Sequence, residues 1–337
     1  DYRVASDANK KLALGAKQWS MRRRPFFLGV GFHHPHTKWR IPQKTWRDYE
    51  SRRIAMPEIT RKTKGAPFYA FGDNNIAPTA ITIDGTHHRV PAKPYKEGKE
   101  LPEHVVRELR RGYLASVAFL DVQVGRVLDQ VDDLHLTNDT VIIFTSDHGY
   151  GIGERGHWGK GSLYEIDARV PLIVRDPHHR HMWGRSTNAL VELVDLYPTI
   201  MDLLEIESPK FLQGKSLKPF LKGDSALPRD CAFTELQLNK KNGVAQGYSI
   251  KTKRFRLTQW KFNGETSYEL YDHKYDSAEL NNISNQPYYS QAKDSLIDLL
   301  NKRIIITQSV PDGLGRQINN VKPYNEPRRM IHKNKKQ

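Results

Sequence analysis

The sequence has one cysteine, Cys231, and no run of 18 consecutive apolar residues among its 337 positions. One cysteine excludes an internal disulfide framework and a cysteine-rich zinc site. The missing apolar run excludes a helix that spans a membrane. The share of hydrophobic residues is low, at 38%, but the 12 Phe, 6 Trp and 15 Tyr argue against a disordered chain.

The charge balance is strongly positive, with 53 Lys+Arg against 38 Asp+Glu and a net charge of +15. Such an excess favours polyanionic partners: nucleic acid, an anionic membrane, or a sulfated or uronate-rich polysaccharide. No helix-turn-helix, zinc-finger or RNP motif accompanies the charge, so we do not expect a nucleic-acid partner. The last 16 residues hold six basic residues and one acid, and we interpret residues 311–337 as a basic tail.

Hydrophobic periodicity divides the chain into two parts. The three-and-four spacing predicts amphipathic helices over residues 6–22, 104–134 and 189–206. Continuous apolar runs predict buried strands over 26–32, 140–145 and 170–174, and a helix between strands favours a parallel α/β core. Residues 37–102 show little periodicity and are expected to form long loops over a functional face. After about residue 224, short alternating segments predict a small antiparallel sheet, followed by a helix near 289–305.

One polar segment follows directly on the strand at 140–145 and reads TSDHGYGIGERGHWGK over 145–160. Ligands of open α/β sheets bind beyond the carboxyl ends of the strands, and Asp147 followed by His148 is a natural metal-ligand pair there. Lys160 ends the loop and can return a positive charge to it. Alternatively, Asp147 caps the next element and His148 is an ordinary surface residue.

A second polar segment, PFFLGVGFHHPHTKWR over 25–40, also follows an apolar run. One of its histidines could act as a general acid, because imidazole titrates near neutral pH. His33 and His36 could bind zinc, but no third ligand stands at a helical spacing. The alternative is an exposed, histidine-rich turn.

Together, in this order, the two segments resemble the type I sulfatases of the alkaline phosphatase superfamily, and most closely the iduronate-2-sulfatase group. The segments VPLI at 170–173 and LVDLYPT at 193–199 are similar to motifs that follow in that family. The resemblance implies a central sheet flanked by helices. Residues 1–224 would form most of the catalytic domain and residues 225–310 a C-terminal domain with an antiparallel sheet and a helix.

The resemblance also implies roles for individual residues. Asp147 and His148 would bind one divalent cation, expected to be Ca2+. Lys160 would contact the sulfate oxygens, and His33 would help to protonate the leaving alcohol. The substrate's carboxylate or sulfate groups would meet four further residues: His34, His36, Lys38 and Arg40.

The nucleophile of this family, a formylglycine made within Cys/Ser-x-Pro-x-Arg, has no counterpart here, because Cys231 is followed by Ala-Phe-Thr-Glu. The early Asp-Asp pair of the family's metal site is absent too. Since the chain begins at Asp1 rather than Met, we interpret it as a fragment that lacks an N-terminal segment of the same protein. We expect it to be inactive alone.

The resemblance predicts hydrolysis of sulfate esters on a polysaccharide, plausibly an iduronate 2-sulfate type, by an exported protein that is secreted, periplasmic or lysosomal. Two alternatives stay open at this point. One is a phosphodiesterase or phosphonate hydrolase of the same superfamily, with Zn2+ or Mn2+ at Asp147 and His148. The other is a non-catalytic binder of polyanionic glycans.

Overall fold

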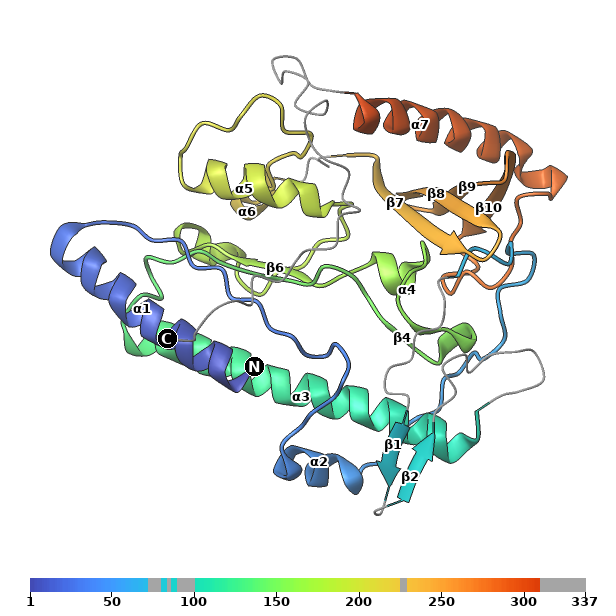
Figure 1. The fold of residues 1–337 in the computed structure, drawn as a ribbon. Coiled ribbons are helices and arrows are strands. Elements are labelled where there is room, and N and C mark those ends of the chain that lie inside the picture. Colours follow the sequence, from blue (N-terminus) through green and yellow to red (C-terminus); the bar gives the residue numbers. More distant parts are fainter. Residues whose placement is uncertain (72–79, 84–85, 90–100, 225–228, 310–337) are drawn as a thin grey trace, which may run out of the picture.

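The structure is a computed structural model that describes residues 1–71, 80–83, 86–89, 101–224 and 229–309. The predicted basic tail, 311–337, lies outside the described residues. The described part combines helices, short strand pairs and one larger sheet, as expected for a mixed α/β protein (Figure 1).

Two long helices lie side by side along one edge of the molecule (Figure 1). Helix α1 (Tyr2–Arg22) buries small residues at three-and-four spacing against α3 (Glu103–Asp133), which lets the two helices approach closely. Leu12, Val131 and Leu136 form the core between them. Helix α2 (Gln43–Glu50) packs on α3 as well, and β1 (Ala80–Ile83) pairs with β2 (Thr86–Arg89) in an antiparallel hairpin.

The expected parallel pairing is wrong. Strand β3 (Ile142–Thr145) pairs with β6 (Leu172–Arg175), and the two run antiparallel. The expectation that both faces are buried is also wrong, since Phe144 is 38% exposed and Ile173 60%. An apolar run reports that a segment can be buried but does not say which strand lies beside it, or in which direction.

Two further expectations for this region are corrected. Residues 26–32 form no strand; they run as an irregular segment in which Phe27 is 78% exposed. The helix expected over 189–206 is shorter: a 3-10 turn (Leu193–Asp195) precedes α5 (Leu196–Leu203). The 3-10 turn begins with a capping box, in which the backbone N–H of Glu192 donates to the Asp195 carboxylate at 2.8 Å.

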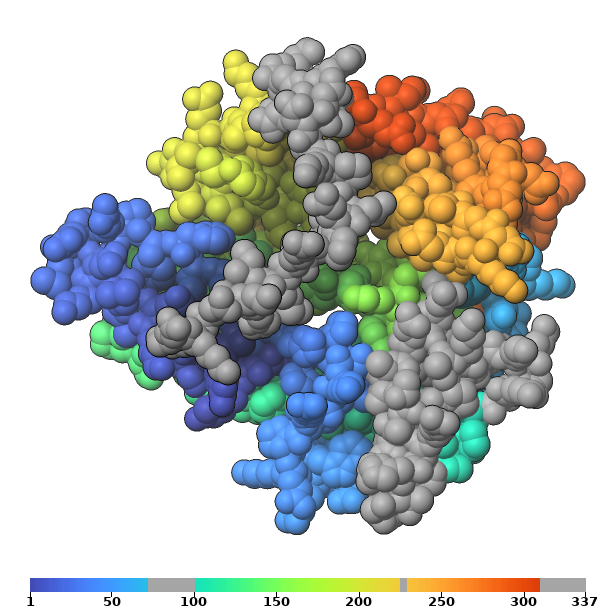
Figure 2. All heavy atoms as spheres, viewed as in Figure 1, coloured from blue at the N-terminus to red at the C-terminus, as the bar shows by residue number. Residues whose placement is uncertain are grey.

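Short elements connect these parts. They are the two-residue strands β4 (Gly151–Ile152) and β5 (Trp158–Gly159), the 3-10 turns η1 (Glu154–Gly156) and η2 (Pro177–Met182), α4 (Glu165–Ala168) and α6 (Lys218–Lys222). Strands β4 and β5 pair antiparallel and close a tight loop. This green central segment lies between the blue N-terminal part and the orange sheet (Figures 1 and 2).

The C-terminal antiparallel sheet and its helix are confirmed. The order is β10 (Glu265–Asp272), β9 (Phe255–Phe262), β8 (Gly243–Thr252) and β7 (Cys231–Lys240), with α7 (Ser290–Gln308) packed against the sheet. Ile250, Leu257, Leu270 and Leu300 are fully buried between sheet and helix. Alternation of apolar and polar residues made these strands visible in the sequence.

Buried ion pairs tie this sheet to the preceding part of the chain. Arg229 pairs with Glu192 and Asp195, and Arg303 of α7 reaches Glu192 at 2.9 Å. On the other side, Arg256 of β9 pairs with Glu165 of α4 and with Glu279. Buried charges need such partners, so the two parts are held in one relative orientation.

Candidate functional site

Strand β3 ends at Thr145 and delivers Asp147 and His148 to the loop that also carries Lys160. The Lys160 Nζ lies 2.7 Å from the His148 Nε2, and an Asp147 carboxylate oxygen lies 3.6 Å from the same nitrogen. Residues 12 positions apart in sequence thus meet because β4 and β5 fold the loop back on itself. The structure brings together these three predicted site residues.

The hydrogen bonds define the proton positions on His148. Its Nδ1 lies 2.8 Å from the carbonyl oxygen of Gly149. A carbonyl only accepts, so Nδ1 donates and Nε2 keeps a lone pair, which accepts from the Lys160 ammonium. A lone pair beside a carboxylate also suits a divalent cation, and the side chain of Asp147 is 84% exposed and available. A carboxylate and an imidazole nitrogen are thus close together, and the role of Asp147 and His148 as ligands of a cation stays a prediction.

The glycine after His148 is required by its surroundings. A Cβ on Gly149 would lie 2.0 Å from the carbonyl oxygen of Ile166, which no structure tolerates. The Gly149 backbone N–H donates to the Asp167 carbonyl at 2.8 Å. The loop thus passes directly over the backbone of α4, and a side chain at this position would lift it away.

The second predicted segment, residues 33–40, forms a compact turn built around one carboxylate. Asp1 accepts from the backbone N–H groups of His33 and His34 at 2.8 and 2.9 Å, and from the His34 Nδ1 at 2.5 Å. The rings of His33 and His36 lie 4.9 Å apart and both contact the Thr37 carbonyl. The turn presents His33 and His36 at the surface and withdraws His34.

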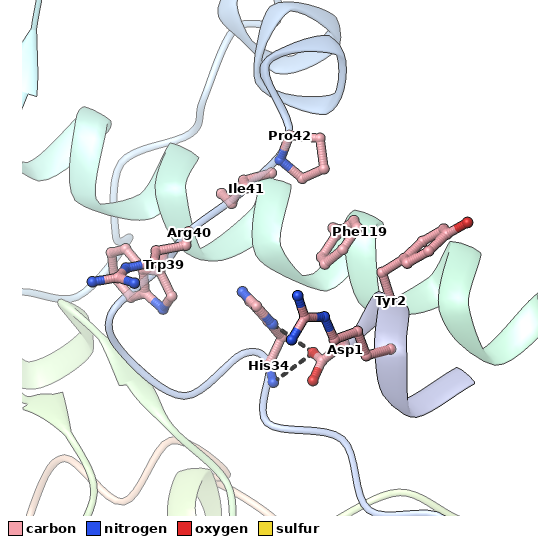
Figure 3. A pocket seen from close by; sticks show the side chains of 9 residues that line it. Asp1, Tyr2, His34, Trp39, Arg40, Ile41, Pro42 and Phe119 are labelled. Carbon is pink, nitrogen blue, oxygen red and sulfur yellow. Dashed lines mark hydrogen bonds and ion pairs between the residues drawn. The ribbon is translucent and has the colours of Figure 1, made fainter. Parts of the chain in front are cut away.

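An open pocket of about 790 Å³ lies beside this turn. Figure 3 shows Asp1 at the start of α1, His34 in the turn and Phe119 on α3 around the pocket, with Arg40 and Trp39 at its other end. Burial lowers the pKa of His34, outweighing its backbone hydrogen bond with Arg40, so the imidazole is neutral at neutral pH. The pocket joins aromatic walls to an arginine, which suits a ligand with an apolar face and a negative charge.

An aromatic ladder connects the two segments. Trp39 packs edge-on against Tyr113 of α3 at 6.1 Å, and Tyr113 stacks on Tyr150 at 5.4 Å. Burial raises the pKa of Tyr150 to about 12, so its hydroxyl stays protonated. Among the described residues no hydrogen bond or ion pair joins the two segments directly. The ladder shows that α3 positions both, and nothing in the sequence marked Tyr150 for this role.

Another group of possible ligands lies away from this loop. Ligand atoms of Glu165, His273 and Glu279 lie within 4.8 Å of one another. Arg256 and Arg155 already face the carboxylates of this group, at 2.6 and 3.6 Å from Glu279. These guanidinium groups supply the positive charge that a cation would bring, so we interpret the group as structural.

Cys231 takes no part in either segment. It is 4% exposed on β7, and burial raises the pKa of its thiol. A buried thiol of raised pKa is a poor nucleophile. Among the described residues, no helix combines the length and the apolar composition that crossing a membrane requires.

Comparisons with known proteins agree with the motifs. Residues 5–206 match the sulfatase family model, and residues 153–305 match that of the C-terminal region of N-sulphoglucosamine sulphohydrolase. Mouse iduronate 2-sulfatase is 32% identical over 291 residues, which cover 70% of this chain and 52% of that protein. An N-acetylglucosamine-6-O-sulfatase from Bacteroides thetaiotaomicron is 33% identical over 208 residues, covering 60% of this chain and 37% of that protein.

Solved structures show the same fold. A structure determined in complex with its substrate, D-glucosamine-2-N,6-O-disulfate, matches with a TM-score of 0.70 at 23% identity and covers 93% of this chain and 72% of its own. A phosphonate monoester hydrolase from Silicibacter pomeroyi matches with a TM-score of 0.69 at 23% identity, over 90% of this chain and 60% of its own. The chain spans about half the length of the curated iduronate 2-sulfatases that it matches. On the match of the family model over most of the first two-thirds of the sequence, this chain belongs to the sulfatase family.

Proposed function

We propose that this chain forms part of an enzyme that removes sulfate from a polysaccharide, with a 2-sulfated iduronate as the first candidate substrate. The observation that carries the proposal is the convergence of Lys160, His148 and Asp147 at the end of β3, with Nζ 2.7 Å from Nε2. The likeness to iduronate 2-sulfatase supports this choice of sugar, and the positive net charge suits a polyanionic substrate.

In this proposal each residue has a distinct task. The Lys160 ammonium contacts the sulfate oxygens and stabilises the charge that develops on them. His33 protonates the leaving alcohol, since it is exposed at the surface of its turn. His36, Lys38 and Arg40 stand on the same exposed turn and His34 lines the pocket beside it, so these four would meet the negative groups of the sugar.

Asp147 and His148 would hold the divalent cation. When bound, the cation would neutralise the charge of the sulfate group. The exposed Asp147 carboxylate and the lone pair on His148 Nε2 would be the chain's own contribution to that site, and the Lys160 ammonium, which lies 2.7 Å from this nitrogen, would have to turn away from it when the cation binds. Oxygen ligands are typical of Ca2+, the ion that we expect, whereas an imidazole ligand also suits Zn2+ or Mn2+.

The nucleophile would come from an N-terminal segment of the same protein. Two observations support this: the chain spans about half of the matched relatives, and the β3–β6 pair exposes Phe144 and Ile173. The exposed apolar faces of such a strand pair are surfaces that another layer covers, and its unpaired edges are where further strands add. The isolated chain should therefore be marginally stable and prone to aggregate; a soluble, monomeric, cooperative melt would contradict this part of the proposal.

The first experiment is to read the open reading frame upstream and to express the whole product. We expect a Cys/Ser-x-Pro-x-Arg motif and an Asp-Asp pair there; their absence would reject catalysis. The product is then assayed on iduronate 2-sulfate and N-acetylglucosamine 6-sulfate disaccharides, with Lys160→Ala as the inactive control. Turnover of N-acetylglucosamine 6-sulfate alone would reject the proposed substrate but would still support sulfatase activity.

The imidazole of His148 favours a second candidate, a phosphodiesterase or phosphonate hydrolase that uses Zn2+ or Mn2+. Paired sulfate and phosphonate ester assays on the metal-analysed protein separate the two. A non-catalytic glycan binder is a third outcome. It predicts salt-dependent heparin affinity that persists in Asp147→Asn and Lys160→Ala variants and no turnover of any ester.

We also propose that the protein is exported, to the outside of the cell, the periplasm or the lysosome. The sequence holds two Asn-x-Ser/Thr triplets, at Asn138 and Asn282. The Asn282 side-chain amide donates to the carbonyls of Gly65 and Tyr268 at 2.9 and 3.0 Å, so it is engaged in the fold. Asn138 is therefore the better candidate for a glycan, which mass spectrometry of protein secreted from a eukaryotic host would detect.

A further inference from the structure

We propose that Asp167, together with His157, is a positioning residue that sets the relative placement of His148 and Lys160. The inference rests on the proposed function, since it concerns the same site. Asp167 lies outside the two segments that led to the site, and His157 lies within the segment 145–160 at a position to which no role was assigned. Neither residue would touch the substrate.

Asp167 contacts both arms of the loop that bears the site. Its backbone carbonyl accepts from the N–H of Gly149, the residue directly after His148, at 2.8 Å. Its side-chain Oδ2 accepts from the backbone N–H and the hydroxyl of Ser162, at 2.8 and 2.7 Å. Ser162 stands two positions after Lys160. One residue therefore fixes the chain beside each of the two side chains that meet at 2.7 Å.

His157 completes the arrangement from inside the loop. Its Nε2 lies 3.2 Å from the Asp167 Oδ2, and the two side chains are only 2% and 4% exposed. The ring also packs against Gly151, where a Cβ would lie 2.5 Å from the imidazole Cδ2. His157 thus packs on Gly151 of β4, three positions before Lys160.

The burial of this pair is difficult to explain without a positioning role. A buried carboxylate and a buried imidazole lose hydration, and neither imidazole nitrogen makes a hydrogen bond to any described residue. An apolar pair of similar volume would fill the space at a lower cost in desolvation. The ionisable pair adds directional contacts that an apolar pair lacks. The Asp167 Oδ2 accepts from two donors of Ser162 and also faces the His157 imidazole. We infer that the pair holds the spacing of the two loop arms within the fraction of an ångström on which catalytic contacts depend.

The test uses His157→Gln and Asp167→Asn in the product of the whole reading frame, with His179→Gln as the matched control. His179 also pairs with an aspartate, Asp176, at 2.6 Å, but on η2 and away from the loop. The positioning role predicts that kcat falls at least about tenfold in both loop variants while KM changes less than about threefold, because a displaced Lys160 loses contacts that count in the transition state. The control variant His179→Gln should keep the wild-type kcat and KM.

A second readout does not depend on activity. Histidine-selective NMR of the ring nitrogens reports whether Nε2 of His148 still accepts from Lys160. We expect the chemical shifts of the His148 ring nitrogens to change in both loop variants and to remain at their wild-type values in His179→Gln. An unchanged His148 spectrum with unchanged kcat in folded variants overturns the inference. A changed spectrum in a protein that hydrolyses no ester supports the positioning role and rejects the proposed function, so the two failures are distinguishable.

If His157→Gln fails to fold, the Asp167→Asn variant alone tests the positioning role. Asparagine keeps the shape of the side chain, and its carbonyl oxygen can still accept from Ser162, so the loss is confined to the charge facing His157. A thermal melt and near-UV circular dichroism verify folding. A lowered melting temperature with unchanged kcat per folded molecule would show that the pair serves stability only, and would reject the inference.

Discussion

Replacement of Glu279 by glutamine should weaken the attachment of the C-terminal sheet, and do so in a way that depends on pH. Glu279 has no exposed surface and accepts from Arg256 at 2.6 Å and from His273 at 2.9 Å. Its carboxylate also faces Arg155 of the site loop at 3.6 Å and accepts from the backbone N–H of Glu165 at 2.8 Å. The substitution removes the negative charge and keeps the size.

The magnitude follows from the shift in pKa. Burial alone would raise the pKa of Glu279, but Arg256 and the other donors outweigh it and lower the pKa from 4.5 to about 2. A shift of this size corresponds to about 3 kcal/mol of unfolding free energy. Because the pKa in the folded state is depressed, this stability is present above pH 4.5 and is lost as the pH falls toward 2. By pH 3 the wild type should lose about 2 kcal/mol from this group.

The assay is urea unfolding of the whole product between pH 7 and pH 3, with Glu265→Gln as the control for an exposed glutamate. At pH 7, Glu279→Gln should cost about 3 to 5 kcal/mol, because Arg256 stays buried with one carboxylate fewer. The gap to the wild type should narrow by about 2 kcal/mol at pH 3. A cost below about 1 kcal/mol at pH 7, or a gap that does not change with pH, would refute the reasoning.

The other predictions concern the site. Lys160→Ala should lower kcat by about 100- to 1000-fold, measured on the best sulfate ester. A rise in KM with unchanged kcat would instead assign the residue to substrate binding. His33→Gln should slow alkyl sulfates far more than aryl sulfates, since only a poor leaving group needs a proton; equal losses would count against an acid role. Gly149→Ala should cost several kcal/mol of stability, because its Cβ would meet the Ile166 carbonyl at 2.0 Å, and Gly31→Ala, with nothing within 4 Å, is its control in the same melt.

The periodicity of the sequence predicted the parts of the fold whose apolar residues repeat. Helix α3 was expected over 104–134 and spans Glu103–Asp133, and the four alternating segments after residue 224 form one antiparallel sheet. Both patterns depend only on which residues of one element face inward, so they can be predicted from the local sequence. The domain boundaries near 224 and 310 stay predictions.

The pairing of strands could not be predicted from the local sequence in the same way. The runs at 26–32 and 140–145 look alike in composition, yet the first forms no strand and the second pairs antiparallel with β6. Whether a run becomes a strand depends on a partner that can satisfy its backbone hydrogen bonds, and that partner is remote in sequence. The helix expected over 189–206 was too long, because the capping box of Glu192 and Asp195 starts a 3-10 turn inside the apolar stretch and α5 begins only at Leu196.

The sequence by itself determined where the motifs lie, and from them it predicted which residues do chemistry: Asp147, His148 and Lys160 in one loop, and His33 in another. It also determined that Cys231 lies outside the motif that a sulfatase nucleophile needs. Only the tertiary structure decided that Lys160 faces His148, that Asp167 and His157 lie buried behind them, and that Trp39, Tyr113 and Tyr150 link the two segments. The physical reason is that a motif specifies residue types along one strand or loop, whereas distances of a few ångström between side chains are set by packing among elements far apart in the chain.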